Sequence, residues 1–172
     1  HWMERSFGGA LSGTSPRSRL LSEPAKVFGN HDPSKRDLLL EYFVPMGQFS
    51  TFVKKAAPII KQEYDTLLNV TVREIAQDVD SALPYAREDM FGFVILFTID
   101  RTIDAEKGIS KMASQMIDLA DSLGGTFYLP YRNFASHKQI RRGYPGFSRF
   151  LAKKKELDPQ EIFSSGFYQQ YR

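Results

Sequence analysis

The sequence predicts an α+β protein with a ferredoxin-like βαββαβ arrangement, in which two βαβ units interleave in one antiparallel sheet. Three observations lead to this prediction. Hydrophobic segments follow the order strand, helix, strand, and this order occurs twice between residues 38 and 129. The strand-like segments are rich in β-branched and aromatic residues, whereas one long stretch repeats apolar residues at helical spacing. The helices should cover one face of the sheet and leave the other face free for a ligand or partner.

The first strand–helix–strand unit lies between residues 38 and 75. Leu38–Val44 is an apolar run with aromatic and β-branched character that ends at a proline, as expected for a strand. Ser50 is expected to cap a helix that extends to about Glu63, and Pro58 should kink or restart that helix. Leu67–Ile75 alternates apolar and polar residues, which predicts a half-buried strand.

The second unit lies between residues 91 and 129. Phe91–Ile99 reads as a fully apolar strand, and Asp104 is expected to cap the clearest helix of the chain. Glycines 124 and 125 should end that helix, and Thr126–Leu129 reads as a short last strand. The apolar stripe of the helix consists of Ile109, Met112, Ala113, Met116, Ile117, Ala120 and Leu123.

Three regions follow from these patterns. Residues 1–36 are rich in glycine, serine and proline and should be irregular, packing on a domain that the chain lacks. Residues 37–132 form the ferredoxin-like domain, and residues 133–172 form a helical C-terminal extension. Within the extension, His137–Lys155 should be helical with a break near Gly143, and Asp158 should cap a short helix over 159–164.

Composition narrows the classes of function. The net charge is +3, from 23 basic and 20 acidic residues, and so mild an excess does not require a nucleic-acid partner. The chain has no cysteine, which excludes disulfides, thiolate zinc sites and cysteine nucleophiles. The three histidines are scattered without metal-ligand spacing. No apolar stretch is long enough to cross a membrane, so we expect a cytoplasmic or membrane-peripheral protein.

One motif points to RNA. Phe91-Gly92-Phe93-Val94 lies on the third strand, where RNA-recognition domains carry aromatic residues that stack on bases. The basic residue and glycine that open that motif are replaced here by Asp89-Met90, and its last aromatic position is Leu96. The alternative is that these phenylalanines belong to the core. Burial of Phe91 and Phe93 under the helices would remove the basis for RNA binding.

A second signal consists of polar residues on or just after apolar strands. Such side chains are seldom buried without a partner. If they meet on one sheet face, they would suit a polyhydroxylated or anionic substrate, and otherwise they form an exposed edge or a surface ion pair. These residues are Glu41, Arg73, Tyr128, Tyr131 and Arg132.

Several segments resemble the C-terminal part of FAD-linked oxidases of the vanillyl-alcohol-oxidase superfamily, which includes aldonolactone oxidases, alditol oxidase and decaprenylphosphoryl ribose oxidase. The resemblance covers about residues 20–172. It is carried by five segments, Glu41–Pro45, Val70–Asp78, Gly125–Arg132, Gly143–Pro145 and Lys154–Phe163, the last of which contains the Asp-Pro ending of the superfamily.

The resemblance implies that this chain is the substrate-side cap of a larger enzyme. An upstream domain of the same parent would hold most of the FAD, and a sugar-like alcohol or lactone would transfer a hydride to the flavin. The isolated cap would be inactive. We expect no nucleic acid and no transmembrane segment. The alternatives are a single-stranded RNA-binding module and a non-catalytic interaction domain.

The resemblance also assigns site residues. Arg73 matches the cap arginine that polyol and lactone oxidases use, and Tyr131 replaces a lysine; these two are the expected catalytic residues. Thr71 stands where those enzymes have an acidic residue, Leu96 where alditol oxidase has a histidine, and Glu41 where decaprenylphosphoryl ribose oxidase has a glutamine. Most of the polar residues that line the substrate site in those enzymes are therefore replaced in this chain. A neighbour such as Arg132 or Arg73 would have to lower the pKa of Tyr131 for it to act as a base. The expected substrate-binding residues are Glu41, Thr71, Tyr128 and Arg132.

Overall fold

A computed structural model describes residue 30 and residues 32–172, and the chain from Asp32 onward is one compact unit. Four strands form an antiparallel sheet in the order β2-β3-β1-β4, which is the order that two interleaved βαβ units give. The predicted α+β, ferredoxin-like fold is therefore confirmed. The strands are β1 (Lys35–Pro45), β2 (Leu67–Ile75), β3 (Met90–Asp100) and β4 (Thr126–Phe127). The region 1–36, expected to be irregular, lies largely outside the described residues, and its end belongs to β1.

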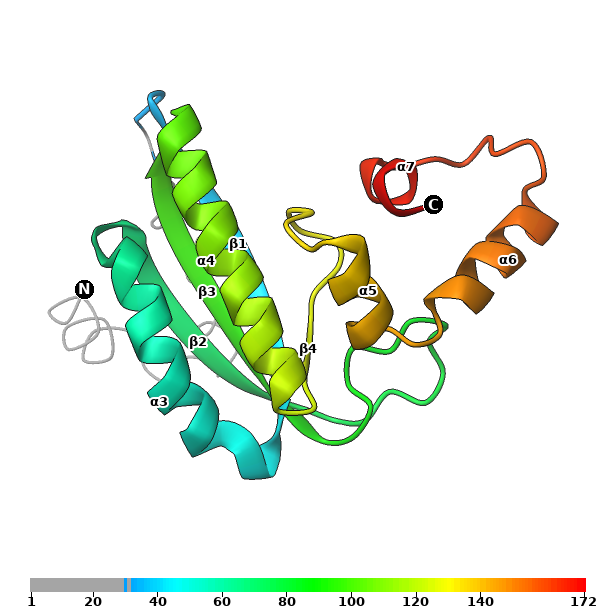
Figure 1. The fold of residues 1–172 in the computed structure, drawn as a ribbon, viewed down its shortest axis with the longest axis horizontal. Coiled ribbons are helices and arrows are strands. Elements are labelled where there is room, and N and C mark those ends of the chain that lie inside the picture. Colours follow the sequence, from blue (N-terminus) through cyan, green and yellow to red (C-terminus); the bar gives the residue numbers. More distant parts are fainter. Residues whose placement is uncertain (1–29, 31) are drawn as a thin grey trace, which may run out of the picture. The chain divides into compact units, whose positions relative to one another are not determined.

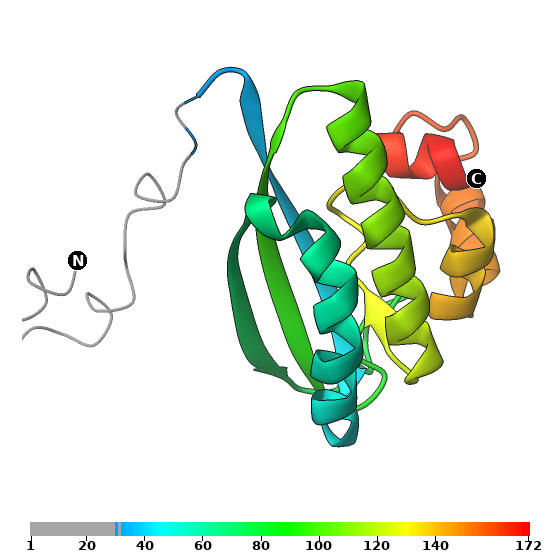
Figure 2. The ribbon, with the colours of Figure 1, turned by 60° about the vertical axis from the view of Figure 1, so that its left-hand side comes forward.

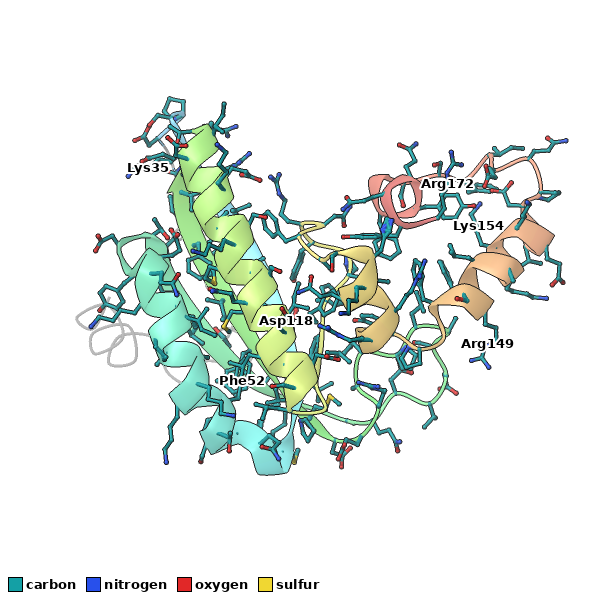
Figure 3. The ribbon with its side chains drawn as sticks, viewed as in Figure 1. Lys35, Phe52, Asp118, Arg149, Lys154 and Arg172 are labelled. Atoms are coloured by element: carbon teal, nitrogen blue, oxygen red, sulfur yellow. The ribbon has the colours of Figure 1, made fainter. Side chains whose placement is uncertain are left out.

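Helices α3 (Phe49–Ile60) and α4 (Ile103–Ser122) lie on the same face of the sheet (Figures 1 and 2). Phe52 of α3, labelled in Figure 3, packs on Phe93 of β3 with 4.6 Å between the ring centroids. From α4, all but one of the predicted stripe residues are buried, and Leu123, just after the helix, is partly buried. The fully buried side chains of β1 and β3 that face these helices are Leu38, Leu40, Tyr42, Val44, Phe93, Ile95, Phe97 and Ile99.

The ends of α4 follow ordinary capping chemistry, with one correction to the prediction. Thr102, and not Asp104, is the N-cap, because Thr102 has an extended backbone and its side chain accepts the N–H of Ala105 at 3.2 Å. Asp104 is already inside the first turn, where its negative charge interacts favourably with the helix dipole. At the other end Gly124 has φ +78°, a left-handed conformation that stops the helix as predicted.

The start of α3 also differs from the prediction. A short 3-10 helix, η2 (Met46–Gln48), leads into it, and Gln48 rather than Ser50 is the N-cap, without a side-chain bond. Pro58 lies in the last turn of α3, so its missing N–H interrupts little of the helix. The chain continues as a 3-10 helix, η3 (Lys61–Thr66), to the start of β2.

Strand β2 has the predicted bounds, but the prediction that it is half-buried is wrong. All of its residues except the first and last are exposed. It is the edge strand of the sheet, and α3 leaves its helix-side residues Val70 and Val72 about two-fifths exposed. Alternation of residue types gives the two faces of a strand but does not give its position in the sheet.

The last strand, β4, is shorter than predicted, and just before it Gly125 brings the chain very close to β1. A Cβ at Gly125 would lie 2.1 Å from the carbonyl oxygen of Phe43. Only Thr126 and Phe127 then pair with β1, and the N–H of Tyr128 donates one further bond to the carbonyl of Glu41 at 2.9 Å. The residues after Tyr128 leave the sheet.

The C-terminal extension consists of α5 (His137–Gly143), α6 (Phe147–Leu157) and α7 (Gly166–Tyr171), so the predicted break near Gly143 is confirmed. Arg142 of α5 forms ion pairs with Asp118 and Asp121 of α4, which link the extension to the domain.

The helix predicted over 159–164 does not form. The Asp158 carboxylate accepts the backbone N–H groups of Ile162 and Phe163, each at 2.9 Å, and pairs with Lys154. Glu161 has φ +54°, which a helix cannot contain. Asp158 therefore organises a turn instead of capping a helix.

Candidate functional site

The sheet face opposite α3 and α4 carries three of the predicted site residues. Glu41 of β1 is level with Val94 of β3 and Thr71 of β2. Arg73 of β2 lies in the next row, opposite Gly92 of β3. Since side chains alternate along a strand, Glu41, Thr71 and Arg73 all point away from the helices.

Glu41 lies at the centre of this group. Burial raises the pKa of its carboxyl group, while the positive charge of Arg73 and a hydrogen bond from the Tyr131 hydroxyl act in the opposite direction. Glu41 and Tyr131 line one small hollow, and Arg73 is near enough for its charge to act on both, although the three come from two strands and a loop. A carboxyl group with a raised pKa holds its proton to a higher pH than usual, which suits proton exchange with a ligand.

Tyr131 also belongs to an aromatic group on the same face. Its ring lies 4.8 Å from that of Tyr128, measured between centroids. Tyr128 in turn contacts Phe43 at 6.3 Å and Tyr85 at 5.7 Å, and Tyr85 stacks on Phe43 at 4.5 Å. Tyr85 is held by its own carbonyl, which accepts the hydroxyl of Thr126. The face therefore combines a wall of aromatic rings with the Glu41 carboxyl group and the Arg73 guanidinium group.

Tyr131 is suited to donate a proton and not to accept one. Burial is the main cause that raises the pKa of its hydroxyl group, and the nearby charge of Glu41 raises it further. Arg73 opposes this rise but does not reverse it. The neighbour effect that would have made Tyr131 a base is outweighed, so we assign it the role of hydrogen-bond donor.

Arg132 lies at the border of this group, and its charge is paired elsewhere. Its guanidinium group pairs with Glu106 of α4, which also pairs with Arg36 of β1. It lies 5.6 Å from the ring centroid of Phe134. This ion-pair cluster fastens the loop after β4 to α4, although Arg132 also lines the small hollow that Glu41, Tyr128 and Tyr131 line.

The aromatic motif that resembled an RNA-binding strand faces the helices. Phe93 is 4% exposed and packs on Phe52, and Phe91 packs on Phe49 with centroids 5.1 Å apart. Neither ring lies on the free face, where bases would have to stack. The RNA hypothesis has therefore lost the observation on which it depended.

A much larger hollow lies elsewhere, between α3, η3 and β2 on the helix side. Its volume is about 930 Å³, and its walls are mostly apolar, with Phe49, Val53, Val70 and Val72 among the lining residues. By contrast, the hollow beside Glu41, Tyr128 and Tyr131 holds only about 20 Å³. Size favours the apolar cleft as a binding surface. The free face has the convergent titratable groups, so it is the better candidate for chemistry.

Sequence reasoning missed Tyr85 and the apolar cleft. Tyr85 lies in a loop without periodicity, and only its contact with Phe43 identifies it. The cleft had a signal, because Val53 and Ala57 extend the apolar stripe of α3 beyond Phe52 and Ala56. A stripe wider than one sheet edge can cover indicates uncovered apolar surface.

No protein-family model and no curated protein matches this chain. Within residues 30 and 32–172 there is no group of three or more histidine, cysteine, aspartate or glutamate residues that could hold a metal ion. In that same part of the chain, every helix is too short or too polar to span a membrane.

Proposed function

We propose that this chain is the substrate-side cap of an FAD-dependent oxidoreductase that oxidises a CH–OH group of a sugar-like alcohol or lactone. One structural observation carries the proposal: Glu41, Arg73 and Tyr131, chosen from sequence, converge on the sheet face that the helices leave free. The resemblance to FAD-linked oxidases supplies the reaction class. The isolated chain would bind substrate weakly and would not turn it over.

The free face suits contact with a planar ring. Leu39, Val94 and Leu96 are partly exposed there and form an apolar patch near Arg73. The described residues contain no glycine-rich turn leading into a helix that would hold a pyrophosphate. This chain would thus contact only the ring end of FAD, and a domain outside it would hold the rest. When bound, FAD accepts the hydride from the substrate carbon.

Each polar residue then has a role derived from its surroundings. Arg73 binds a substrate oxygen or carboxylate through its guanidinium group. Tyr131 donates a hydrogen bond from a hydroxyl group that stays protonated because its pKa is raised. Glu41 accepts the proton that leaves the substrate hydroxyl, and its raised pKa makes the carboxylate a stronger base than an exposed glutamate.

The test is made on the full-length protein that contains this chain, purified without added flavin. A flavin absorption band near about 450 nm that a sugar alcohol or lactone bleaches is the expected result. A colourless protein that takes up no FAD would refute the proposal. In the flavin-loaded protein, Arg73→Ala should lower kcat/KM by at least about a hundredfold. Arg149→Ala, on the exposed side of α6, is the matched control and should leave turnover unchanged (Figure 3).

A non-catalytic interaction domain is the second candidate. The exposed apolar cleft favours it, because a contiguous apolar surface of this kind marks a binding partner in soluble proteins.

A further inference from the structure

We infer that Tyr85, in the loop between β2 and β3, positions the Tyr131 hydroxyl group against Glu41 through the ring of Tyr128. Tyr85 is thus a positioning residue, because it acts on the candidate site through another side chain. The contact itself needs no flavin, whereas its effect on turnover rests on the proposed function.

Tyr131 is held by its ring more than by its backbone. The N–H of Tyr128 donates to the carbonyl of Glu41 at 2.9 Å, and within residue 30 and residues 32–172 no backbone–backbone hydrogen bond involves residues 129–131. The ion pair of Arg132 anchors the next residue, but it does not set the rotamer of Tyr131. Tyr131 is 36% exposed, and its ring packs on that of Tyr128 at 4.8 Å between centroids. The direction of the Tyr131 side chain therefore depends on where the Tyr128 ring lies.

The ring of Tyr128 is in turn placed by two other rings. It packs edge to face against Tyr85 at 5.7 Å and against Phe43 at 6.3 Å. Tyr85 stacks on Phe43 at 4.5 Å, and Phe43 is 1% exposed. Aromatic pairs at such distances favour defined ring orientations. Phe43, Tyr85 and Tyr128 thus form one packed group that ends at Tyr131.

The loop that carries Tyr85 is fastened to the chain around β4. The carbonyl of Tyr85 accepts the hydroxyl of Thr126, and the guanidinium group of Arg87 donates to the carbonyl of Gly125 at 3.3 Å. These bonds hold the Tyr85 ring in its stack on Phe43. A functional side chain keeps its geometry when its neighbours have rotamers that packing has locked, and Tyr85 is such a neighbour for the ring that supports Tyr131.

Glu41 reports whether Tyr131 is in place. The two residues line a hollow of only about 20 Å³, so a small displacement of the Tyr131 ring separates them. Burial raises the pKa of Glu41, and the charge of Arg73 and the hydrogen bond from Tyr131 lower it. The response of this pKa to loss of the Tyr131 hydroxyl group therefore measures whether that hydroxyl reaches the carboxylate.

A titration of Glu41 tests the inference on the chain alone. NMR of isotope-labelled glutamate follows its carboxyl group, and Glu41→Gln identifies the signal. Tyr131→Phe keeps the ring and removes the hydroxyl, so it should raise the pKa of Glu41. In a Tyr85→Leu background the same substitution should leave that pKa unchanged, because the hydroxyl is already displaced.

Two other backgrounds are matched controls. Tyr85→Phe keeps the ring, and Tyr64→Leu makes the same change on η3, at a side chain that is 67% exposed and outside the aromatic group. In both, Tyr131→Phe should raise the pKa of Glu41 as far as it does in the parent. If circular dichroism shows that Tyr85→Leu does not fold, Tyr128→Leu replaces it, with the same result expected.

A rise of equal size in the Tyr85→Leu background would overturn the inference, as would a pKa of Glu41 that Tyr131→Phe leaves unchanged in the parent. In the flavin-loaded full-length protein, Tyr85→Leu should lower kcat at least about tenfold, whereas Tyr85→Phe should not. A full-length protein that takes up no FAD would refute the proposed function and leave the titration result standing. The two failures are therefore distinguishable.

Discussion

A pair of adjacent substitutions on β3 tests which face of the sheet is covered. Phe97 is fully buried and faces the helices, whereas Leu96 points to the free face and is only partly buried. Phe97→Ala should cost about 3 to 5 kcal/mol of unfolding free energy, through lost transfer energy and the cavity left behind. Leu96→Ala should cost only about 1 to 2 kcal/mol, because much less apolar area leaves contact.

Urea unfolding followed by circular dichroism measures the difference. With a slope of about 2 kcal/mol per molar urea, Phe97→Ala should lower the midpoint by about 1.5 to 2.5 M and Leu96→Ala by less than about 1 M. If Phe97→Ala does not fold, Phe97→Leu should still fold and lose about 1.5 kcal/mol. Equal losses for Leu96→Ala and Phe97→Ala would show that the supposed free face is covered too. The proposed reaction site would then be inaccessible.

Three further outcomes are expected. Gly125→Ala should lower the Tm strongly, because its Cβ would lie 2.1 Å from the carbonyl oxygen of Phe43, whereas Gly47→Ala, with nothing within 4 Å, should not; equal Tm values would contradict the close approach of β4. Glu41→Gln should unfold like the parent at pH 4 and be more stable than it at pH 8, since a raised folded-state pKa penalises the charged carboxylate only as the pH rises above its ordinary value of 4.5; a constant difference across this range would exclude the raised pKa. Asp158→Ala should speed amide hydrogen exchange at Ile162 and Phe163, which lose their acceptor; in the parent, the hydrogen bond from Lys154 holds the pKa of Asp158 below its usual 3.8, so protection there should fail only in stronger acid.

The candidate site was predictable from sequence in part. Glu41 and Arg73 were predicted as site residues because charged side chains in apolar strands are seldom buried without a partner. Alternation along β1 and β2 places both on one face. Their proximity to Tyr131 was not predictable from spacing, because it depends on how the chain leaves β4 after Gly125. Arg132, one residue further, turns to Glu106 instead. Neighbours in a loop have no fixed periodicity, so sequence cannot assign them to a face.

The sequence by itself determined the four strands and two long helices of the ferredoxin-like domain and their order. The stripe of α4, the apolar run of β3 and the glycines after α4 each have a local cause, and local causes are readable in a chain. The tertiary structure alone decided three things: β2 lies at an edge, α3 leaves it uncovered, and Asp158 bonds a turn rather than a helix. Each of these depends on contacts or backbone geometry that no local pattern specifies. Phe93 is a further example. Its sequence motif resembles that of an RNA-binding strand, but its packing under α3 buries the ring, and only the tertiary structure shows this.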